Sequence, residues 1–293
     1  MVTSEIFIEA NVDNMIDTTI TLTRHRESNE LIFKTLAGLA SQQDVRASIL
    51  FLDQNPDDET AIFCHDHNSD NITFDYRPLE SVGLSHARNL AIEACKTDTL
   101  LFIDADATAR FDWAKKLAET LHLENIGVAG GRVFLVWSRK PLLVARARVV
   151  REQYSMLDYG PGMMPVRKIV GAGFGINIQR MGGEAIFDEK LGRQKGKLLG
   201  GEETDLCLRA IRAGLRVMYQ GDAIVDHQVL PDKVTYRWIF RRLYYAGVNR
   251  ALLRGLPSPT HRMTAWDYVL MPIVLAPYTL GYLQGLGMRG RTP

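Results

Sequence analysis

The 293-residue sequence is poor in cysteine and has no recognisable export signal. Its three cysteines, Cys64, Cys95 and Cys207, are odd in number and lack the spacing of a metal site. They are expected to be small apolar fillers in a reducing, cytoplasmic compartment. The acidic N-terminus has no basic-then-apolar segment, so no secretion signal is predicted. No internal repeat or low-complexity tract is visible, which argues against a repeat architecture.

Charge is distributed unevenly along a chain of ordinary globular composition. The sequence is 46% hydrophobic and 24% charged, which argues against disorder. Residues 1–130 hold 10 Lys and Arg against 22 Asp and Glu, whereas residues 131–293 hold 25 against 12. The net charge of +1 therefore hides an acidic half and a basic half. The basic half is expected to meet an anionic partner such as phosphates or lipid head groups.

Short β-branched segments alternate with helical segments in the first half of the chain. Strands are expected at residues 18–22, 48–52, 72–76 and 99–103, with helices after Ser28 and at 85–95. Such alternation across short loops predicts an α/β fold with a mostly parallel sheet flanked by helices. Ligands gather where parallel strands end. Asp53, Asp104 and Asp106 follow strands and are expected to converge on one crevice.

The second half continues the alternation less regularly. A strand is expected at residues 126–134, a basic helical stretch at 140–156, a helix at 202–213 and a strand at 216–219. The glycine-rich run from Val170 to Gly175 is not a dinucleotide fingerprint, because no strand–turn–helix unit with a later ribose carboxylate frames it.

The most informative segment is Asp104-Ala105-Asp106, which directly follows the apolar run Leu100–Ile103. Two carboxylates at the end of a buried strand repel each other and lose hydration. Such a pair is normally tolerated only where a cation or sugar hydroxyls compensate for these costs. Oxygen ligands of this kind suit Mg²⁺ or Mn²⁺ carrying a phosphate-bearing ligand. Taken alone, an Asp-x-Asp motif is more often part of a solvated loop after a strand.

Four further segments place polar residues at element ends. They are FLDQNPDD with Asp53, GLSHARNLAIEA with Arg88, GGEETDLCLRAIRAG with Glu202 and Glu203, and AIVDHQV with His227. Each alone has a structural interpretation, as a turn residue, a charge at a helix start or a structural histidine. In this order, over roughly residues 18–230, they resemble glycosyltransferase family 2, inverting nucleotide-sugar enzymes of GT-A fold.

The resemblance implies a role for each matching position on the donor side. Asp53 matches the strand-end acid that hydrogen-bonds the nucleobase, and Thr23 and Arg88 match nucleotide-side positions. Asp104 would lean towards the ribose and sugar. Asp106 would ligate the metal ion on the diphosphate, and the late histidine, His227, would complete that metal site.

The resemblance also implies the acceptor side and the base. Residues 171–177, with Gly173 and Asn177 among them, match the segment that lines the sugar and acceptor pocket, together with Arg180. Glu203 falls where the family has its general base, although the family usually has Asp there. A base works better with a raised pKa, and neighbouring Glu202 and Asp205 are expected to raise that of Glu203. Asp205 is the other candidate for the base.

Two other functions stay open at this point. One is a nucleotidyltransferase of related fold, whose chemistry requires a basic, glycine-rich loop near the N-terminus. The first loop of this sequence contains Arg24 and Arg26 but no glycine. The other is a non-catalytic nucleotide-sugar-binding or membrane scaffold protein, which the Glu203 replacement makes conceivable. Hydrolysis of nucleotide sugars by the wild type and site variants separates the three.

The C-terminal part has a different pattern. A helix rich in Arg and aromatic residues is expected over Lys233–Gly255, and residues 268–288 carry no charge over 21 positions. That length nominally spans a bilayer, but Pro272, Pro277 and three glycines interrupt it. A shallow, re-entrant or interfacial pair of helices is favoured over packing on the catalytic domain and over a true span. Flanking basic residues favour an anionic cytoplasmic leaflet.

Together these patterns predict three parts: a nucleotide-binding half at residues 1–130, an acceptor and sugar-binding half at 131–231, and a membrane-associated helical extension at 232–293. The expected function is metal-assisted, inverting transfer of a sugar from a nucleotide-diphosphate donor, UDP by family preference, to a hydroxyl of a lipid-linked or polysaccharide acceptor. The protein is expected to be peripheral at the inner face of the cell membrane, with no nucleic-acid partner.

Overall fold

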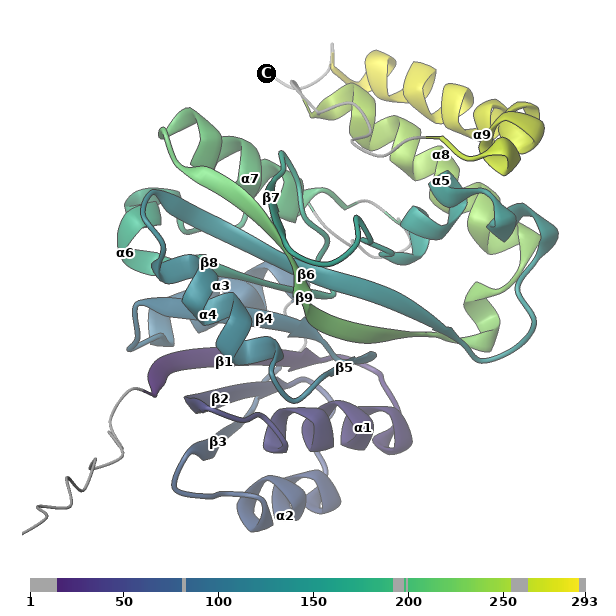
Figure 1. Ribbon diagram of the computed structural model, residues 1–293. Helices are drawn as coiled ribbons and strands as arrows, with labels where there is room; N and C mark the ends of the chain where they lie inside the picture. Colours follow the sequence, from purple (N-terminus) through teal and green to yellow (C-terminus); the bar gives the residue numbers. More distant parts are fainter. Residues whose placement is uncertain (1–14, 81–82, 192–197, 199, 254–262, 290–293) are drawn as a thin grey trace, which may run out of the picture.

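The computed structural model describes residues 15–80, 83–191, 198, 200–253 and 263–289. They form one nine-stranded sheet in the order β3-β2-β1-β4-β8-β6-β9-β5, with β7 paired to β9 (Figure 1). The strands are β1 (Ile16–Arg24), β2 (Val45–Asp53), β3 (Ile72–Pro78), β4 (Thr99–Asp104), β5 (Ala107–Ala109), β6 (Ile126–Trp137), β7 (Met163–Pro165), β8 (Gly173–Asn177) and β9 (Arg216–Val229). The division at residue 130 falls inside β6, so the two expected halves share a sheet.

The sheet is parallel in its first half and mixed beyond it. Strands β3, β2, β1 and β4 pair in parallel, as expected from the alternation of strands and helices. Their apolar runs are buried because helices cover the sheet, and Ile20, Phe51 and Phe102 are at most 1% exposed. Strand β8 then joins β4 antiparallel, and β9 pairs with β6 in parallel but with β5 and β7 antiparallel.

The helices that flank the sheet follow amphipathic patterns. They are α1 (Asn29–Ala40), α2 (Asp58–Asp66), α3 (Leu84–Ala94), α4 (Trp113–His122), α6 (Ile178–Met181) and α7 (Glu202–Arg212), with a 3₁₀ turn η3 (Gly182–Glu184) after α6. In α1 four of the apolar positions that recur at helical spacing, Leu31, Ile32, Leu36 and Leu39, are buried, and the fifth, Ala40, is partly buried. Gly214 follows α7 with a φ of 82°, a left-handed conformation suited to glycine at a helix end.

Two expectations for the second half are wrong in extent. The basic stretch 140–156 is not one helix but three short turns, η1 (Leu143–Arg146), α5 (Arg148–Arg151) and η2 (Glu152–Tyr154). Ala147 is extended with a ψ of 132°, and Ser155 has a φ of 69°, so the backbone leaves the helical region at both places. The strand expected at 216–219 runs on to Val229, and this extension carries His227 into the sheet.

The C-terminal extension consists of η4 (Pro231–Lys233), α8 (Tyr236–Leu252) and α9 (Ala265–Arg289). The pair of short helices expected at 268–288 is one continuous helix that contains both prolines. Helix α9 packs closely on α8 because Gly247 and Gly281 leave no side chain between the two backbones. The expected end of the preceding helix, Gly255, lies outside the described residues. This extension and the turns around α5 share a second apolar core.

Candidate active site

A cavity of about 790 Å³ opens where β1 and β4 end, between the sheet and α8. Parallel strands present their carboxyl ends at one edge of a sheet, and Thr23 of β1 lies opposite Asp104 of β4 in the strand register. The cavity wall includes six of the residues predicted from the sequence: Thr23, Arg88, Asp104, Asp106, Glu202 and Glu203. Residues from four distant parts of the chain therefore meet in one hollow.

The Asp pair and His227 are brought together by strand pairing. The chain turns at Asp104-Ala105-Asp106 from β4 into β5, a strand of three residues that pairs with β9. In this pairing Ala107 lies opposite His227, and the Gln228 N–H donates to the Asp106 carbonyl at 2.7 Å. The His227 Nε2 consequently lies 3.1 Å from Asp106 Oδ1. The predicted proximity of Asp106 and His227 is thus present.

These three side chains are suited to holding a divalent ion. One ligand atom from each of Asp104, Asp106 and His227 lies within 4.8 Å of the others. Two carboxylates and an imidazole are donors that Mn²⁺ and Mg²⁺ accept. Burial would raise the pKa of Asp106, but the facing His227 and Lys233 hold that pKa well below its usual value, so Asp106 is a carboxylate. His227 Nδ1 is buried and has no hydrogen-bond partner among the described residues.

Arg88 lies at the centre of the acidic cluster. Its guanidinium contacts Asp104 at 3.3 Å, Glu202 at 3.4 Å and Glu203 at 3.0 Å. The side chain is 3% exposed and lies 5.4–6.0 Å from the ring centroids of Phe102, Phe174 and Phe187. A buried cation of this kind is tolerated because the carboxylates pair with it and the rings face it. Arg88 joins the Asp pair to the glutamate pair.

The two adjacent glutamates are in different electrostatic states. Burial, and then the charge of Glu203, raise the pKa of Glu202 to about 8. For Glu203, burial would raise the pKa, but the Arg88 guanidinium holds it below the usual value. The expectation that Glu202 raises the pKa of Glu203 is therefore wrong, because Arg88 lowers that pKa and the Glu202 side chain, through its hydrogen bond, lowers it further. At neutral pH Glu203 is ionised and Glu202 protonated.

Gly171 makes room for this arrangement. A Cβ at this position would collide with Glu203 Oε1 and would approach Arg88 Nη2 to 3.1 Å. The glycine-rich segment before β8 thus lets the backbone pass directly beside the carboxylate. Gly173, two residues on, is instead packed against Val225 and Trp113.

Asn177 and Arg180 lie far from the cavity. Because β8 runs antiparallel to β4, Asn177 pairs with Thr99 at the opposite end of that strand from Asp104. Asn177 caps α6 by accepting from the Arg180 N–H at 3.0 Å. Arg180 donates to carbonyls at the end of α4, among them Leu121 at 2.7 Å. The structure therefore does not bring these two residues to a sugar pocket.

Asp53 is close to the cavity but fully buried. Its Oδ1 accepts from the Asn55 N–H at 2.8 Å. Its Oδ2 accepts from the Tyr76 hydroxyl at 3.0 Å and from Arg24 Nη1 at 3.4 Å. The next residue, Gln54, lines the cavity. Direct contact of Asp53 with a nucleobase would require the Tyr76 and Arg24 contacts to open.

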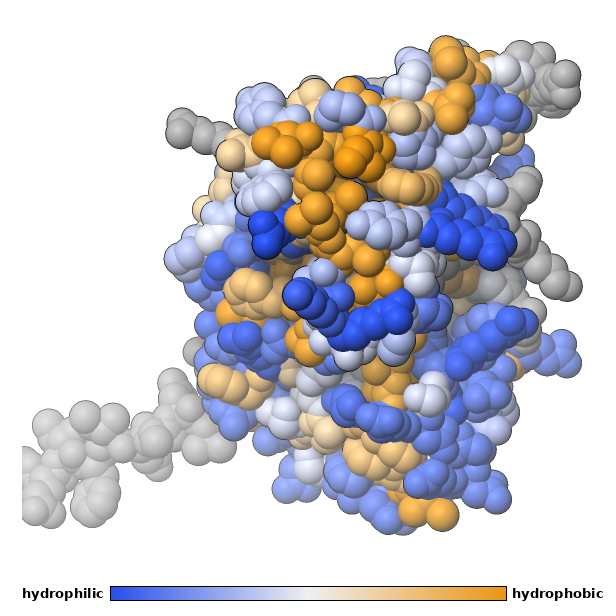
Figure 2. All heavy atoms as spheres, turned by 90° about the vertical axis from the view of Figure 1, so that its right-hand side faces the viewer, coloured by the Kyte–Doolittle hydropathy of each residue, from blue (hydrophilic) through white to orange (hydrophobic). Residues whose placement is uncertain are grey.

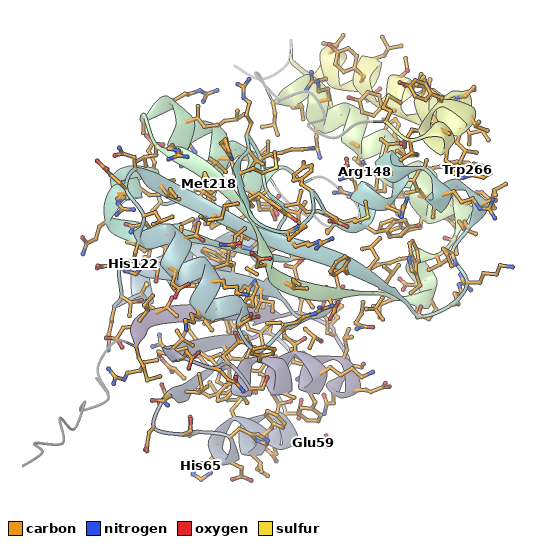
Figure 3. All side chains as sticks on the ribbon, in the orientation of Figure 1. Glu59, His65, His122, Arg148, Met218 and Trp266 are labelled. Carbon is orange, nitrogen blue, oxygen red and sulfur yellow. The ribbon has the colours of Figure 1, made fainter. Side chains whose placement is uncertain are left out.

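The cavity also contains residues that the sequence motifs did not indicate. His25 lines it, whereas His65 lies on the outer end of α2 (Figure 3) with a side chain 86% exposed. Helix α8 contributes Arg242 and Asn249 to the wall, and Lys168 lies on the loop before β8. Periodicity could not identify them, because no pattern in α8 shows which face covers the cavity.

Sequence comparisons identify related proteins. The profile of Glycosyl transferase family 2 matches residues 19–158. A glucosyl-dolichyl phosphate glucuronosyltransferase of Haloferax volcanii is 26% identical over 202 residues, 67% of this chain and 59% of that protein. A pre-mycofactocin glycosyltransferase of Mycobacterium tuberculosis is 30% identical over 206 residues, 67% of this chain and 40% of that protein. The aligned part thus spans about half the length of these relatives.

Solved structures share the fold at low identity. GalNAc-T7 with UDP, GalNAc and Mn²⁺ superposes with a TM-score of 0.58 and 14% identity, over 91% of this chain and 52% of that one. The mannosyltransferase PcManGT of Pyrobaculum calidifontis with GDP-Man and Mn²⁺ superposes with a TM-score of 0.57 and 14% identity, over 92% of this chain and 75% of that one. With the ordered motifs and the cavity, these comparisons show that residues 19–158 belong to glycosyltransferase family 2 and that the chain has a GT-A fold.

Proposed function

We propose that the protein is an inverting glycosyltransferase that moves a sugar from a nucleotide-diphosphate donor to a hydroxyl of a lipid-linked or polysaccharide acceptor. A UDP-sugar is the preferred candidate for the donor. The observation that carries the proposal is the grouping of Asp104, Asp106 and His227 beside the Arg88–Glu203 pair in one cavity. The relatives are named for transfer to a dolichyl phosphate-linked sugar and to pre-mycofactocin. The first of these names supports a lipid-linked acceptor.

The donor would be held by the Asp104 side of the cavity. Asp106 and His227, with Asp104, would hold a divalent cation, Mg²⁺ or Mn²⁺. Such an ion, when bound, neutralises the charge that develops on a leaving diphosphate. Thr23 and Gln54 line the wall at the ends of β1 and β2, where a nucleoside would lie in a parallel sheet.

Glu203 is the proposed general base, since a base must be ionised and must reach the acceptor hydroxyl. It lines the cavity, and Arg88 keeps it charged at neutral pH. Glu202 is protonated there, and Asp205 is engaged by Arg209 at 2.8 Å. The carboxylate of Glu203 would accept the proton as the acceptor oxygen attacks the anomeric carbon. One displacement inverts the configuration, so no enzyme nucleophile is required.

Helix α9 supports a membrane surface as the place of action. It is long and apolar enough to cross a bilayer by length and composition, but one of its faces is covered by α8. The other faces carry exposed apolar side chains, with Tyr268, Val269, Leu280 and Leu283 each at least 60% exposed. Apolar surface gathers over the C-terminal helices and the neighbouring turns in Figure 2.

The residues around α9 favour a position of this helix on the bilayer surface rather than across the bilayer. Helix α8 carries four arginines along its length, so it cannot accompany α9 into the hydrocarbon core. At the start of α9, Arg146 lies 4.6 Å from the ring of Trp266, and the Val149 N–H donates to Asp267 at 3.0 Å. Arg148 and Trp266, labelled in Figure 3, mark this junction. Aromatic and basic residues beside apolar ones are typical of helices in an anionic membrane interface.

The experiment is a donor screen with purified protein and Mn²⁺, comparing the wild type with Glu203→Gln and Asp106→Asn. The wild type is expected to hydrolyse or transfer from one nucleotide sugar, and both variants to lose that turnover. Glu30→Gln, an exposed glutamate on α1 that pairs with Lys34, is the control and should retain it. Donor binding without turnover in the wild type would instead favour a non-catalytic scaffold, and pyrophosphate release from a nucleoside triphosphate would favour a nucleotidyltransferase.

A further inference from the structure

Lys233 places a cation on the second aspartate of the Asp-x-Asp pair. Its Nζ lies 2.7 Å from Asp106 Oδ2, while His227 faces the other oxygen, Oδ1, at 3.1 Å. The Lys233 side chain is only 13% exposed. Each carboxylate oxygen of Asp106 therefore already contacts a basic side chain of the chain itself, at the position where a metal ion would bind.

The contact is not required to hold the local backbone. The Lys233 carbonyl accepts from the Tyr154 hydroxyl at 3.1 Å, and its N–H donates to the Leu230 carbonyl at 3.0 Å. Thr235, two residues later, caps α8 by accepting from the Trp238 N–H at 3.2 Å. Since these bonds fix η4 and the start of α8, the ammonium on its flexible four-carbon stem can change partners while the backbone stays in place.

Charge balance indicates what that change would be. When a divalent ion takes the oxygens of Asp106, the ammonium loses its partner and lies next to a like charge. A diphosphate brought by the same ion supplies the anionic oxygens that an ammonium prefers. Among the described residues near Asp106, Arg88 is committed to Asp104 and the glutamates, whereas Lys233 contacts Asp106 itself and becomes available to the diphosphate when the ion takes that carboxylate.

We propose that Lys233 is a diphosphate-binding residue that pairs with Asp106 in the empty site and turns to the nucleoside diphosphate when a metal ion occupies Asp106. The inference rests on the proposed function, which supplies the donor class. It assigns to the C-terminal extension a direct contact with the donor, in addition to its position beside the membrane.

The test measures two affinities of the full-length protein by calorimetry, that for Mn²⁺ alone and that for UDP or GDP in saturating Mn²⁺. In Lys233→Met the competing ammonium is gone, so Mn²⁺ alone should bind several-fold more tightly. The nucleoside diphosphate should bind at least about tenfold more weakly, because a charge-assisted contact is lost. Lys233→Arg should keep most of the diphosphate affinity. Lys115→Met, which removes a surface pair with Asp44, should change neither.

The proposed role predicts that Lys233→Met raises the affinity for Mn²⁺ and lowers that for the nucleoside diphosphate. These opposite changes distinguish it from a purely structural role and from simple competition with the ion. If both affinities fall in Lys233→Met, the residue only supports the structure of the site, and the inference is overturned. If both rise, Lys233 is merely a competitor of the ion, which overturns it too. Wild-type binding of Mn²⁺–UDP or Mn²⁺–GDP distinguishes these results from failure of the proposed function, in which the wild type binds neither and both proposals fall.

Discussion

Arg88 Nη1 lies 3.0 Å from Glu203 Oε1, although the two residues are 115 positions apart in the chain. The same guanidinium reaches Asp104 at 3.3 Å, so the base proposed for the acceptor and the first aspartate of the donor site share one cation. A movement of either carboxylate therefore changes the field at the other. The pair links the acceptor and donor halves of the cavity through a single buried side chain.

Replacing Arg88 should destabilise the fold. Arg88→Met leaves the acidic side chains of Asp104, Glu202 and Glu203 beside one another without their cation, and breaking buried ion pairs of this kind costs about 3–5 kcal/mol. Urea unfolding measures the loss. Arg77→Met, which removes an exposed pair with Asp75, is the matched control and should cost less than about 1 kcal/mol. Equal losses in the two variants would contradict the central role of Arg88.

The stability of the protein should depend on the protonation of Glu202. Its pKa rises from an ordinary 4.5 to about 8 on folding, so between these values the folded state holds a proton that the unfolded state releases. This contribution is complete below about pH 4.5 and is lost as the pH rises towards 8, with a slope of at most about 1.4 kcal/mol per pH unit.

Glu202→Gln should remove this dependence, because glutamine is neutral at every pH. We compare the free energies of unfolding of the variant and the wild type from pH 5 to pH 9. The difference, variant minus wild type, should increase up to about pH 8 and stay constant above it. Glu59→Gln, on the exposed outer side of α2, should follow the wild type throughout. Parallel curves for Glu202→Gln and the wild type over the whole range would refute the raised pKa.

Adding one methyl group at Gly171 should impair turnover. The Cβ of Gly171→Ala collides with Glu203 Oε1, and displacement of a base by about 1 Å can cost roughly a hundredfold in rate. The effect should fall on kcat, measured with the donor that the screen identifies. Gly183→Ala adds its methyl group in open space and should leave kcat unchanged. A Gly171→Ala enzyme with normal kcat would exclude Glu203, in its present position, as the base.

Mn²⁺ should stabilise the wild type against heat. An ion that binds only the folded state adds about 2.7 kcal/mol at a hundred times its Kd, which raises Tm. His227→Ala and Asp106→Asn should lose most of this rise, since each removes one ligand of the cluster. EDTA should return the wild type to its initial Tm. The exposed histidine variant His65→Ala should keep the full response, and a response kept by His227→Ala would place the ion elsewhere.

Charges on the outer face of α9 should release the protein from membranes. Val269→Asp combined with Leu280→Asp places two carboxylates on side chains that are 65% and 63% exposed. Flotation with vesicles containing phosphatidylglycerol should show wild-type binding and loss of it in the double variant. Ile62→Asp alters a comparably exposed residue on α2 and should bind like the wild type. Binding unaffected by the α9 changes would show that another surface meets the lipid.

Local pattern and strand order account for the part of the site that could be predicted. The apolar run before Asp104 defines β4, and the helix spacing of Leu31, Ile32 and Leu36 defines α1. Parallel order then brings the ends of β1 and β4 to one edge, where Thr23 lies opposite Asp104. These contacts are fixed by short-range periodicity and by one general property of parallel sheets.

The remainder depends on tertiary contacts that leave no periodic signal. Strand β5 has three residues, too few for a recognisable pattern, yet its register with β9 sets His227 beside Asp106. The antiparallel direction of β8 sends Asn177 away from the site, whereas a composition pattern is the same in either direction. Arg242 reaches the site through the docking of α8, and Lys233 through the turn η4 that follows β9, so neither was among the predicted site residues.

The pairing of β5 with β9 also has a consequence for biosynthesis. Asp106 leaves the ribosome long before His227, and β5 has no partner among the described strands until β9 follows it. A nascent chain that ends before β9 can form the parallel strands but holds only two of the three residues of the ion-binding cluster, because domains fold from the N-terminus as they emerge. Under the proposed function, competence for donor binding would therefore arrive late in translation, just before α8 and α9 emerge.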